Sequence, residues 1–389
     1  MTHGVTVIFW TDFATRKTAW TCRTSRAAWT VFFCYFAAVT GLAESGEKNG
    51  HGRFYATMKN IGIASIVVIL ALAMPALSRG QGERLDRIRA ARASDSATEA
   101  ALWFAKEGGF FEKHRLSVEL IRLQGSSLVV STMLAGEIAI SQIGAAAVVD
   151  SALAGSDLIN VATIVKNFVF YIFSRPDIER ISDLKGKAMG TSRYGAISDF
   201  AARFALTKNG LQPEKDVAIL QTGGPAESVA ALSANRIQAV ALTAPATIRA
   251  RKAGLRPLLD ISKLDANFPF NGIVVRRSFL KSNEDIMRRF LMAYIEGVAL
   301  AKKDPAFAKK TMAKYFKSDD REVLDESYDW IVKQNFVLPP YPALPGLTTI
   351  LKAVEARNPK AKTAKPEDFV DMTLVQELDK SGFISSVTK

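Results

Sequence analysis

One structural unit occurs twice in the chain, and this repeat limits the possible folds more than any other feature. Its copies span residues 125–155 and 224–254, so matching positions are 99 residues apart. Each copy reads as a glycine loop, a helix of small residues, a short buried strand, a second loop and a second helix. Gly136 and Asn235 follow the first helix, where the backbone adopts the left-handed conformation that Gly and Asn tolerate. The matched positions are Gly125 with Gly224, Gly136 with Asn235, Ile138 with Ile237, Gly144 with Thr243, and Gly155 with Gly254.

Two equivalent units so placed predict two similar lobes. Strands and helices also alternate outside the repeat, which is typical of mostly parallel sheets covered by helices on both faces. Breaks in the pattern at residues 175–177 and 267–272 suggest two crossings between the lobes. The sequence therefore predicts an α/β protein, with residues 83–173 and 272–389 in lobe 1 and residues 174–271 in lobe 2.

The first 78 residues read as leader sequence. Residues 58–78 carry the pattern of a signal peptide, because Lys59 is followed by a long uncharged apolar core and a small-residue exit. We therefore expect translation to begin at Met58, residues 1–57 to be an upstream extension, and the protein to be exported to the periplasm. A real N-terminal anchor is the alternative, because residues 27–43 are also uncharged, although about 17 residues is the lower limit for a membrane span.

Charge and cysteine usage exclude several classes of function. The net charge of +13 falls to about +9 without residues 1–78, and no run of five or six lysines or arginines occurs. Such an excess is typical of a solvated surface, so the sequence does not predict nucleic-acid binding. Both cysteines, Cys22 and Cys34, precede the signal peptide. The exported part therefore needs no disulfide and has no cysteine for lipid attachment.

Six loops between a strand and the following helix contain the candidate ligand-binding residues. In an open parallel sheet, such loops line a crevice at the carboxyl ends of the strands. The helix N-termini there present unpaired N–H groups and partial positive charge, which suit a small anionic or polar molecule. Helix capping alone is the alternative role of the Ser, Thr and Asp residues. The candidates are Ser94, Asp95, Ser96, Gln124, Ser126, Ser127, Gly144, Tyr194, Gly195, Ser198, Thr222, Gly223 and Thr243.

Tyr194 is the candidate expected to contribute most to binding. It lies between a predicted strand at residues 188–191 and a helix that begins near Ala196, so its ring should overhang the cleft. An aromatic ring there would bury apolar area and still offer a hydroxyl. Packing against the edge of the sheet is the alternative. Arg193 beside it could pair with an anionic ligand or remain a solvated charge.

The sequence carries no recognisable catalytic motif. It contains no P-loop, no G-x-G-x-x-G fingerprint and no G-x-S-x-G nucleophile elbow. His114 is the only histidine after residue 78, so the sequence does not predict a zinc or iron site, and no carboxylate pair stands out. We therefore expect a protein that is not an enzyme and holds no metal or other cofactor.

Several segments resemble a known family. Residues 101–120 (ALWFAKEGGFFEKHRLSVEL) resemble a family pattern in which a helix is followed by glycine and phenylalanine and then by a Gly-Leu entry into the second strand. Here residues 114–116 replace the usual Gly-Leu. Residues 182–187 (SDLKGK), the repeated segments and Pro245 complete the likeness. These features resemble the nitrate/sulfonate/taurine-type and pyrimidine-precursor-type substrate-binding proteins of ABC importers, over residues 85–389. The resemblance implies a two-lobed periplasmic-binding-protein-like fold of type II, with two crossover hinge strands.

The resemblance also implies a function. We expect an exported receptor that captures a small molecule between its lobes by hinge closure and presents it to the membrane permease of an ABC importer. We expect it to act as a monomer. One alternative is an enzyme on the same fold, similar to pyrimidine-precursor synthases, although their Cys-rich iron motif and sacrificial histidine match no segment here. A ligand sensor without a transport role is the other.

Overall fold

The computed structural model describes residues 7–9, 20–22, 85–264, 268–355 and 357–389. The chain divides into two units, Met1–Gly82 and Glu83–Lys389. In the first unit, β1 (Val7–Phe9) pairs antiparallel with β2 (Trp20–Cys22). The signal peptide expected at residues 58–78 and most of the extension expected at residues 1–57 lie outside the described residues. No helix in the described part of the chain is long and apolar enough to span a membrane.

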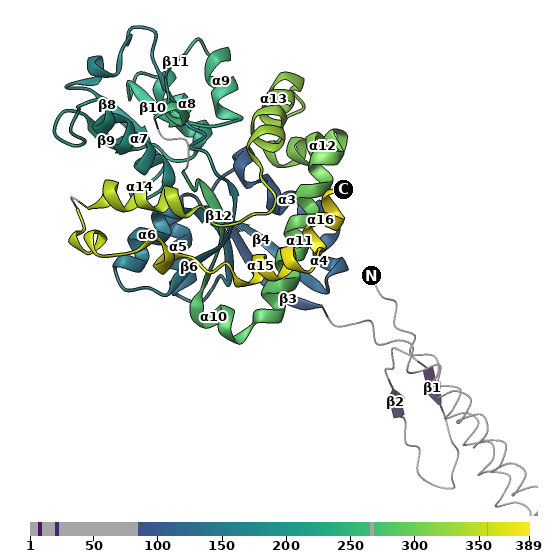
Figure 1. The fold of residues 1–389 in the computed structure, drawn as a ribbon. Helices are drawn as coiled ribbons and strands as arrows, with labels where there is room; N and C mark the ends of the chain where they lie inside the picture. The colour runs from purple at the N-terminus through teal and green to yellow at the C-terminus, as the bar shows by residue number, and fades with distance from the viewer. Residues whose placement is uncertain (1–6, 10–19, 23–84, 265–267, 356) are drawn as a thin grey trace, which may run out of the picture. The chain divides into compact units, whose positions relative to one another are not determined.

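The second unit contains two five-stranded sheets, which lie in separate lobes (Figure 1). The first sheet has the order β4-β3-β5-β12-β6, and the second has the order β11-β7-β10-β8-β9. The strands of the first sheet are β3 (Asp86–Arg92), β4 (Leu116–Arg122), β5 (Ile140–Gly144), β6 (Leu158–Val165) and β12 (Asn271–Arg276). Those of the second are β7 (Tyr171–Ser174), β8 (Ala188–Thr191), β9 (Ala218–Gln221), β10 (Ala239–Leu242) and β11 (Arg256–Asp260).

Each sheet is mostly parallel, as the alternation of strands and helices predicts, with one strand reversed. In the first sheet β12 runs antiparallel to both β5 and β6, and in the second β7 runs antiparallel to both β10 and β11. These are the strands by which the chain enters each lobe from the other. The two mixed sheets flanked by helices confirm the predicted α/β, two-lobed fold.

The first crossing lies slightly earlier than the sequence suggests. The first sheet ends at Val165 and the second begins with Tyr171 in β7, so the boundary expected after residue 173 is a few residues too late. Residues 168–173 form one continuous apolar run, and Phe168 and Phe170 are as buried as a strand interior. Composition therefore does not mark the crossing. The break at residues 175–177 follows the end of β7 instead.

Stacked aromatic rings join the two crossing segments. The rings of Phe168 and Phe268 stack with centroids 4.0 Å apart, and those of Phe170 and Phe270 are 5.2 Å apart. The backbone N–H of Phe270 donates to the carbonyl of Val165 at 2.9 Å. The connection between the lobes is therefore a pair of adjacent segments, residues 166–170 and 268–270, held by buried aromatic contacts.

The two copies of the repeat lie in different sheets, as predicted. The first copy forms α5 (Ser126–Leu134), β5 and α6 (Ala145–Leu153), and the second forms α8 (Pro225–Ser233), β10 and α9 (Ala246–Lys252). After α5 and α8, Gly136 has a φ of 83° and Asn235 a φ of 56°, which confirms the left-handed position inferred from the sequence.

The remaining helices complete the two lobes. Helix α11 (Glu284–Lys303) packs on α3 (Ala100–Glu107), and Gly297 allows this approach because a Cβ there would lie 2.4 Å from the nitrogen of Ala105. Ion pairs from Lys252 of α9 to Asp320 (2.6 Å) and Glu322 (2.7 Å) connect the second lobe with α13. The other helices are η2 (Ala97–Glu99), α3 (Ala100–Glu107), α4 (Phe110–Lys113), η3 (Ile181–Leu184), α7 (Ile197–Lys208), η4 (Ile261–Lys263), α10 (Arg277–Ser282), α11 (Glu284–Lys303), α12 (Pro305–Phe316), α13 (Arg321–Ser327), η5 (Tyr328–Asn335), α14 (Leu344–Val354), η6 (Pro359–Lys362), η7 (Pro366–Phe369), α15 (Thr373–Lys380) and α16 (Phe383–Thr388).

Candidate functional site

A small cavity lies where the two lobes meet. Its volume is about 60 Å³, enough for a few water molecules, since one water needs roughly 10–15 Å³. It is bordered by residues that follow the carboxyl ends of β3 and β4 in the first lobe and of β8, β9 and β10 in the second, which is where open α/β sheets bind ligands. The lining residues are Ala93, Ser94, Arg122, Gln124, Gly125, Ser126, Phe170, Ser192, Ala196, Ile197, Ser198, Gly224, Pro225, Ser228, Ala241, Leu242 and Thr243.

Three helices of eight or more residues begin at this cavity. Ser126 is the first residue of α5, Ile197 the first of α7 and Pro225 the first of α8, and all three line the cavity. The first turn of each helix has backbone N–H groups without intrahelical partners and carries a partial positive charge. Because α5 belongs to one lobe and α7 and α8 to the other, the positive helix ends approach the cavity from both sides.

Arg122 is the only charged residue among those that line the cavity. Its Nε lies 2.6 Å from Oδ2 of Asp95, whose other carboxylate oxygen pairs with Arg92. These three side chains together carry a net positive charge, and the carboxylate of Glu227 lies close by, with its Oε2 2.6 Å from the Cβ position of Gly224. Nearby, burial raises the pKa of Glu99 to about 8, so this side chain is largely protonated at neutral pH and adds little negative charge.

Hydroxyl groups supply most of the other polar contacts. The Oγ of Ser198 lies 3.0 Å from Oγ1 of Thr191 and 2.8 Å from Oγ of Ser192, and the Oγ of Ser228 lies 2.7 Å from Oγ1 of Thr222. Thr243 differs, because its Oγ1 is buried and has no hydrogen-bond partner among the described residues. A buried hydroxyl without a partner is costly, so Thr243 is well placed to bond a ligand that enters the cavity.

The lobes touch each other beside the cavity. The carbonyl oxygen of Ala244 in the second lobe accepts hydrogen bonds from the N–H of Ala97 (2.9 Å) and the Oγ of Ser96 (3.1 Å) in the first. A Cβ built on Gly144 would lie only 2.8 Å from the Cβ of Ile197 across the interface. The two lobes are therefore in direct contact beside the cavity.

Five of the candidates named from the sequence line the cavity, and eight lie around it. Ser96 caps η2 by accepting a hydrogen bond from the N–H of Thr98, so it has the capping role given as the alternative. Asp95 pairs with two arginines, and Thr222 supports Ser228. Lining the cavity are Ser94, Gln124, Ser126, Ser198 and Thr243, whereas Asp95, Ser96, Ser127, Gly144, Tyr194, Gly195, Thr222 and Gly223 are not among the lining residues.

Tyr194 lies beside the cleft and not among the residues that line the cavity. Its side chain is about half exposed, and its hydroxyl donates a hydrogen bond to the carbonyl oxygen of Ile219 at 2.9 Å. The backbone N–H of Tyr194 donates to Oε1 of Gln221 at 3.0 Å. These contacts correspond to the alternative role, in which the tyrosine packs against the edge strand β9.

The sequence reasoning missed several lining residues. Arg122 and Ser192 each lie at, or one residue beyond, the carboxyl end of a strand, so the rule that selected the loops could have included them. Ser228 lies one turn into α8. Its position four residues after Gly224 places it on the same face of the helix as the glycine, and this spacing is the signal that could have identified it. Phe170 belongs to a crossing segment, and nothing in the sequence separates it from the strand interior.

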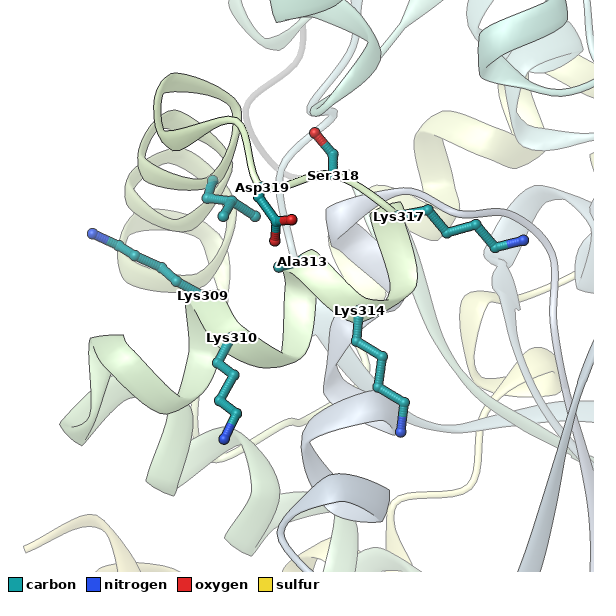
Figure 2. A pocket seen from close by; sticks show the side chains of 8 residues that line it. Lys309, Lys310, Ala313, Lys314, Lys317, Ser318 and Asp319 are labelled. Atoms are coloured by element: carbon teal, nitrogen blue, oxygen red, sulfur yellow. The ribbon is translucent and has the colours of Figure 1, made fainter.

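A second hollow lies on the surface of the first lobe, around α12. Figure 2 shows its lysine side chains, which point in different directions and not toward one point. Lys309 pairs with Asp325 at 2.7 Å, and Lys314 pairs with Glu107 at 2.7 Å. The hollow is open to solvent and partly neutralised, so we interpret it as a solvated face. It is lined by Lys309, Lys310, Ala313, Lys314, Lys317, Ser318, Asp319 and Leu324.

The described residues contain no group of three or more His, Cys, Asp or Glu side chains that could hold a metal ion. His114 lies away from the cavity, where its Nε2 is 3.0 Å from Oε2 of Glu296.

Comparisons with known proteins agree with this architecture. The family model described as NMT1/THI5 like matches residues 97–308. A Bacillus subtilis (strain 168) protein described as a candidate binding protein, YtlA, is 25% identical over 236 residues, which cover 59% of this chain and 70% of YtlA.

Solved structures show the same fold at low sequence identity. The alkanesulfonate-binding protein SsuA of Xanthomonas axonopodis pv. citri, bound to MOPS, is 17% identical with a TM-score of 0.64, over 74% of this chain and 98% of SsuA. The periplasmic nitrate-binding protein NrtA of Synechocystis PCC 6803 is 15% identical, also with a TM-score of 0.64, over 78% of this chain and 91% of NrtA. Because the family model covers more than half of the chain, this protein belongs to the NMT1/THI5-like family.

Proposed function

We propose that this protein is the solute-binding receptor of an ABC importer, which captures a small anionic or polar molecule between its two lobes. The observation that carries the proposal is the cavity itself, because both lobes contribute strand ends and helix N-termini to it. A ligand there contacts both lobes only when the cleft is closed. Binding therefore shifts the equilibrium toward the closed state, and the paired crossing segments act as the hinge.

The lining residues favour a ligand with a negative or strongly hydrogen-bond-accepting group. Arg122, the helix ends of α5, α7 and α8, and several hydroxyls all present donors. No carboxylate is among the lining residues, and the volume is small. Relatives of the same fold are named for alkanesulfonate and nitrate, both of which are compact anions.

An enzyme on the same fold remains the main alternative. The lining residues include no Cys, His, Asp or Glu, so the groups that most often transfer protons or attack as nucleophiles are not at this cavity. This composition favours a binding protein. A membrane permease is the partner that the proposal requires, and we expect the receptor to be a monomer.

Binding of a small anion is expected to stabilise the protein against heat. At a hundredfold excess over Kd, a ligand that binds only the folded state contributes about 2.7 kcal/mol. A thermal-shift screen with methanesulfonate, nitrate, formate, cytosine and ethylamine tests the ligand class. Arg122→Ala removes a charged donor. It should weaken binding of an anion that stabilises the protein in this screen by about 1.5–3 kcal/mol, roughly ten- to a hundredfold.

Arg87→Ala is the matched control. Arg87 is an exposed arginine of β3, at the opposite end of the strand from the cavity, so its loss should leave affinity unchanged. Stabilisation by cytosine or ethylamine, with none by the anions, would show that the proposed ligand class is wrong.

Export is the second expectation. A chain that begins at Met58 should be secreted to the periplasm and trimmed near Ser78, because a positive charge, an apolar core and a small-residue exit follow one another there. Mass spectrometry of the secreted protein gives its N-terminus. A mature N-terminus upstream of Met58 would contradict both the start and the cleavage site.

A further inference from the structure

Two arginines from neighbouring strands share one aspartate at the edge of the cavity. Arg92 of β3 and Arg122 of β4 are direct partners in the parallel register of the first sheet. Asp95, in the loop after β3, places one carboxylate oxygen on each, with Oδ1 paired to Nη1 of Arg92 and Oδ2 at 2.6 Å from Nε of Arg122. The carboxylate therefore bridges two guanidinium groups that would otherwise repel each other.

Arg92 is the fixed member of this group. Its side chain is only 10% exposed, and its guanidinium lies over the rings of Trp103 (5.3 Å) and Tyr315 (5.6 Å). These rings stack on each other with centroids 4.6 Å apart and planes 2° apart. Arg92 also donates to the carbonyl oxygen of Ser94. Burial, cation–π contacts and hydrogen bonds thus anchor Arg92, and through it the carboxylate of Asp95.

Arg122 is the exposed member and faces the cleft. Its side chain is 36% exposed and lines the cavity. While Nε faces Asp95, Nη2 approaches the second lobe, where it lies 3.4 Å from the Cβ position of Gly224. Gly224 immediately precedes α8, so this end of the guanidinium points at the N-terminus of a helix in the opposite lobe.

We propose that Asp95 is a positioning residue and not a ligand contact: anchored by Arg92, it holds the guanidinium of Arg122 toward α8, so that a ligand's negative group binds between them. The part of this proposal that concerns the ligand rests on the proposed function. The bridge itself concerns only three side chains of this chain, and it can be tested without a ligand. Glu227 of α8 lies near the same point, since its Oε2 is 2.6 Å from the Cβ position of Gly224, so its carboxylate competes with an anion for this position.

The first arm of the test is free of ligand. In nitrogen-15 NMR of the mature protein, the Nε proton of Arg122, assigned with Arg122→Lys, should exchange slowly with water because the carboxylate of Asp95 lies 2.6 Å from Nε and holds the guanidinium in place. Asp95→Asn should accelerate this exchange by about tenfold or more, and Asp95→Glu should restore part of the protection. An Arg122 exchange rate that is the same in the wild type and Asp95→Asn overturns the proposal.

The second arm uses inorganic sulfate as the probe, titrated by calorimetry into the wild type and Asp95→Asn. Removal of a nearby negative charge by itself tightens anion binding, whereas loss of positioning weakens it. The direction in which Asp95→Asn changes the sulfate affinity therefore distinguishes a positioning role from a purely electrostatic one. We expect Asp95→Asn to bind sulfate about three- to tenfold more weakly. Tighter binding overturns the positioning role. If the wild type binds no sulfate but the exchange rates behave as expected, the bridge stands and the anionic ligand class of the proposed function is what fails.

Discussion

Replacement of Glu99 by glutamine should stabilise the folded protein by about 4 kcal/mol at pH 8, and by less than about 1 kcal/mol at pH 5. Glu99 lies at the end of η2, is only 4% exposed, and its Oε2 has no hydrogen-bond partner among the described residues. Burial raises its pKa from 4.5 to about 8, and the opposing influences of Arg92 and Asn271 do not offset this. Glutamine has nearly the shape of the protonated side chain but cannot ionise.

The direction of this pH dependence follows from which state, folded or unfolded, holds the proton on Glu99. Between pH 4.5 and pH 8, the folded protein keeps a proton on Glu99 that the unfolded chain has released. The stability contributed by this group is therefore complete below pH 4.5 and decreases by about 1.4 kcal/mol per pH unit until the pH passes 8. Above pH 8 the carboxylate is buried as an anion, and the wild type is at its largest disadvantage relative to the variant.

Urea unfolding of both proteins between pH 5 and pH 9 measures this difference. Other titrating groups are common to both proteins and cancel in the comparison. Glu112→Gln, at an exposed position of the neighbouring helix α4, controls for the loss of one negative charge. If the free energies of unfolding of wild type and Glu99→Gln run parallel across this range, Glu99 is already ionised in the folded protein.

The repeat predicted the architecture well, because its signals are local. Left-handed positions such as Gly136 and Asn235 depend on backbone conformation within one helix end, and small buried strands such as β10 are evident from their apolar composition. The lobe boundary was less predictable. Phe168 and Phe170 pack against the return segment, so they are as apolar as a strand, and only the sheet pairing shows that they cross between lobes.

The site was predictable at the level of loops and less so at the level of side chains. The rule that ligands bind at the carboxyl ends of strands selected loops around Ser94, Gln124 and Ser198, and all three residues line the cavity. It could not decide that Asp95 faces two arginines, because that depends on the register of β3 against β4. Nor could it decide that the hydroxyl of Tyr194 bonds to β9, since this contact joins residues 25 positions apart.

Gly144 offers the most direct test of closure between the lobes. It ends β5 in the first lobe with φ −68° and ψ 136°, a conformation that any residue adopts. An added Cβ would nevertheless lie 2.8 Å from the Cβ and 2.9 Å from the Cδ1 of Ile197, the first residue of α7 in the second lobe. The clash exists only while the lobes are closed, because Gly144 and Ile197 belong to different lobes.

Gly144→Ala should therefore fold normally and bind ligand poorly. We expect the melting temperature without ligand to change little. Overpacking at the closed interface costs about 1–3 kcal/mol, so the affinity for the anion identified in the thermal-shift screen should fall by roughly ten- to a hundredfold. At a ligand concentration that saturates the wild type, small-angle X-ray scattering should give a larger radius of gyration for the variant than for the wild type. Adding Ile197→Gly removes the opposing side chain and should restore most of the affinity. Wild-type affinity in Gly144→Ala would mean that the bound protein does not close at this contact.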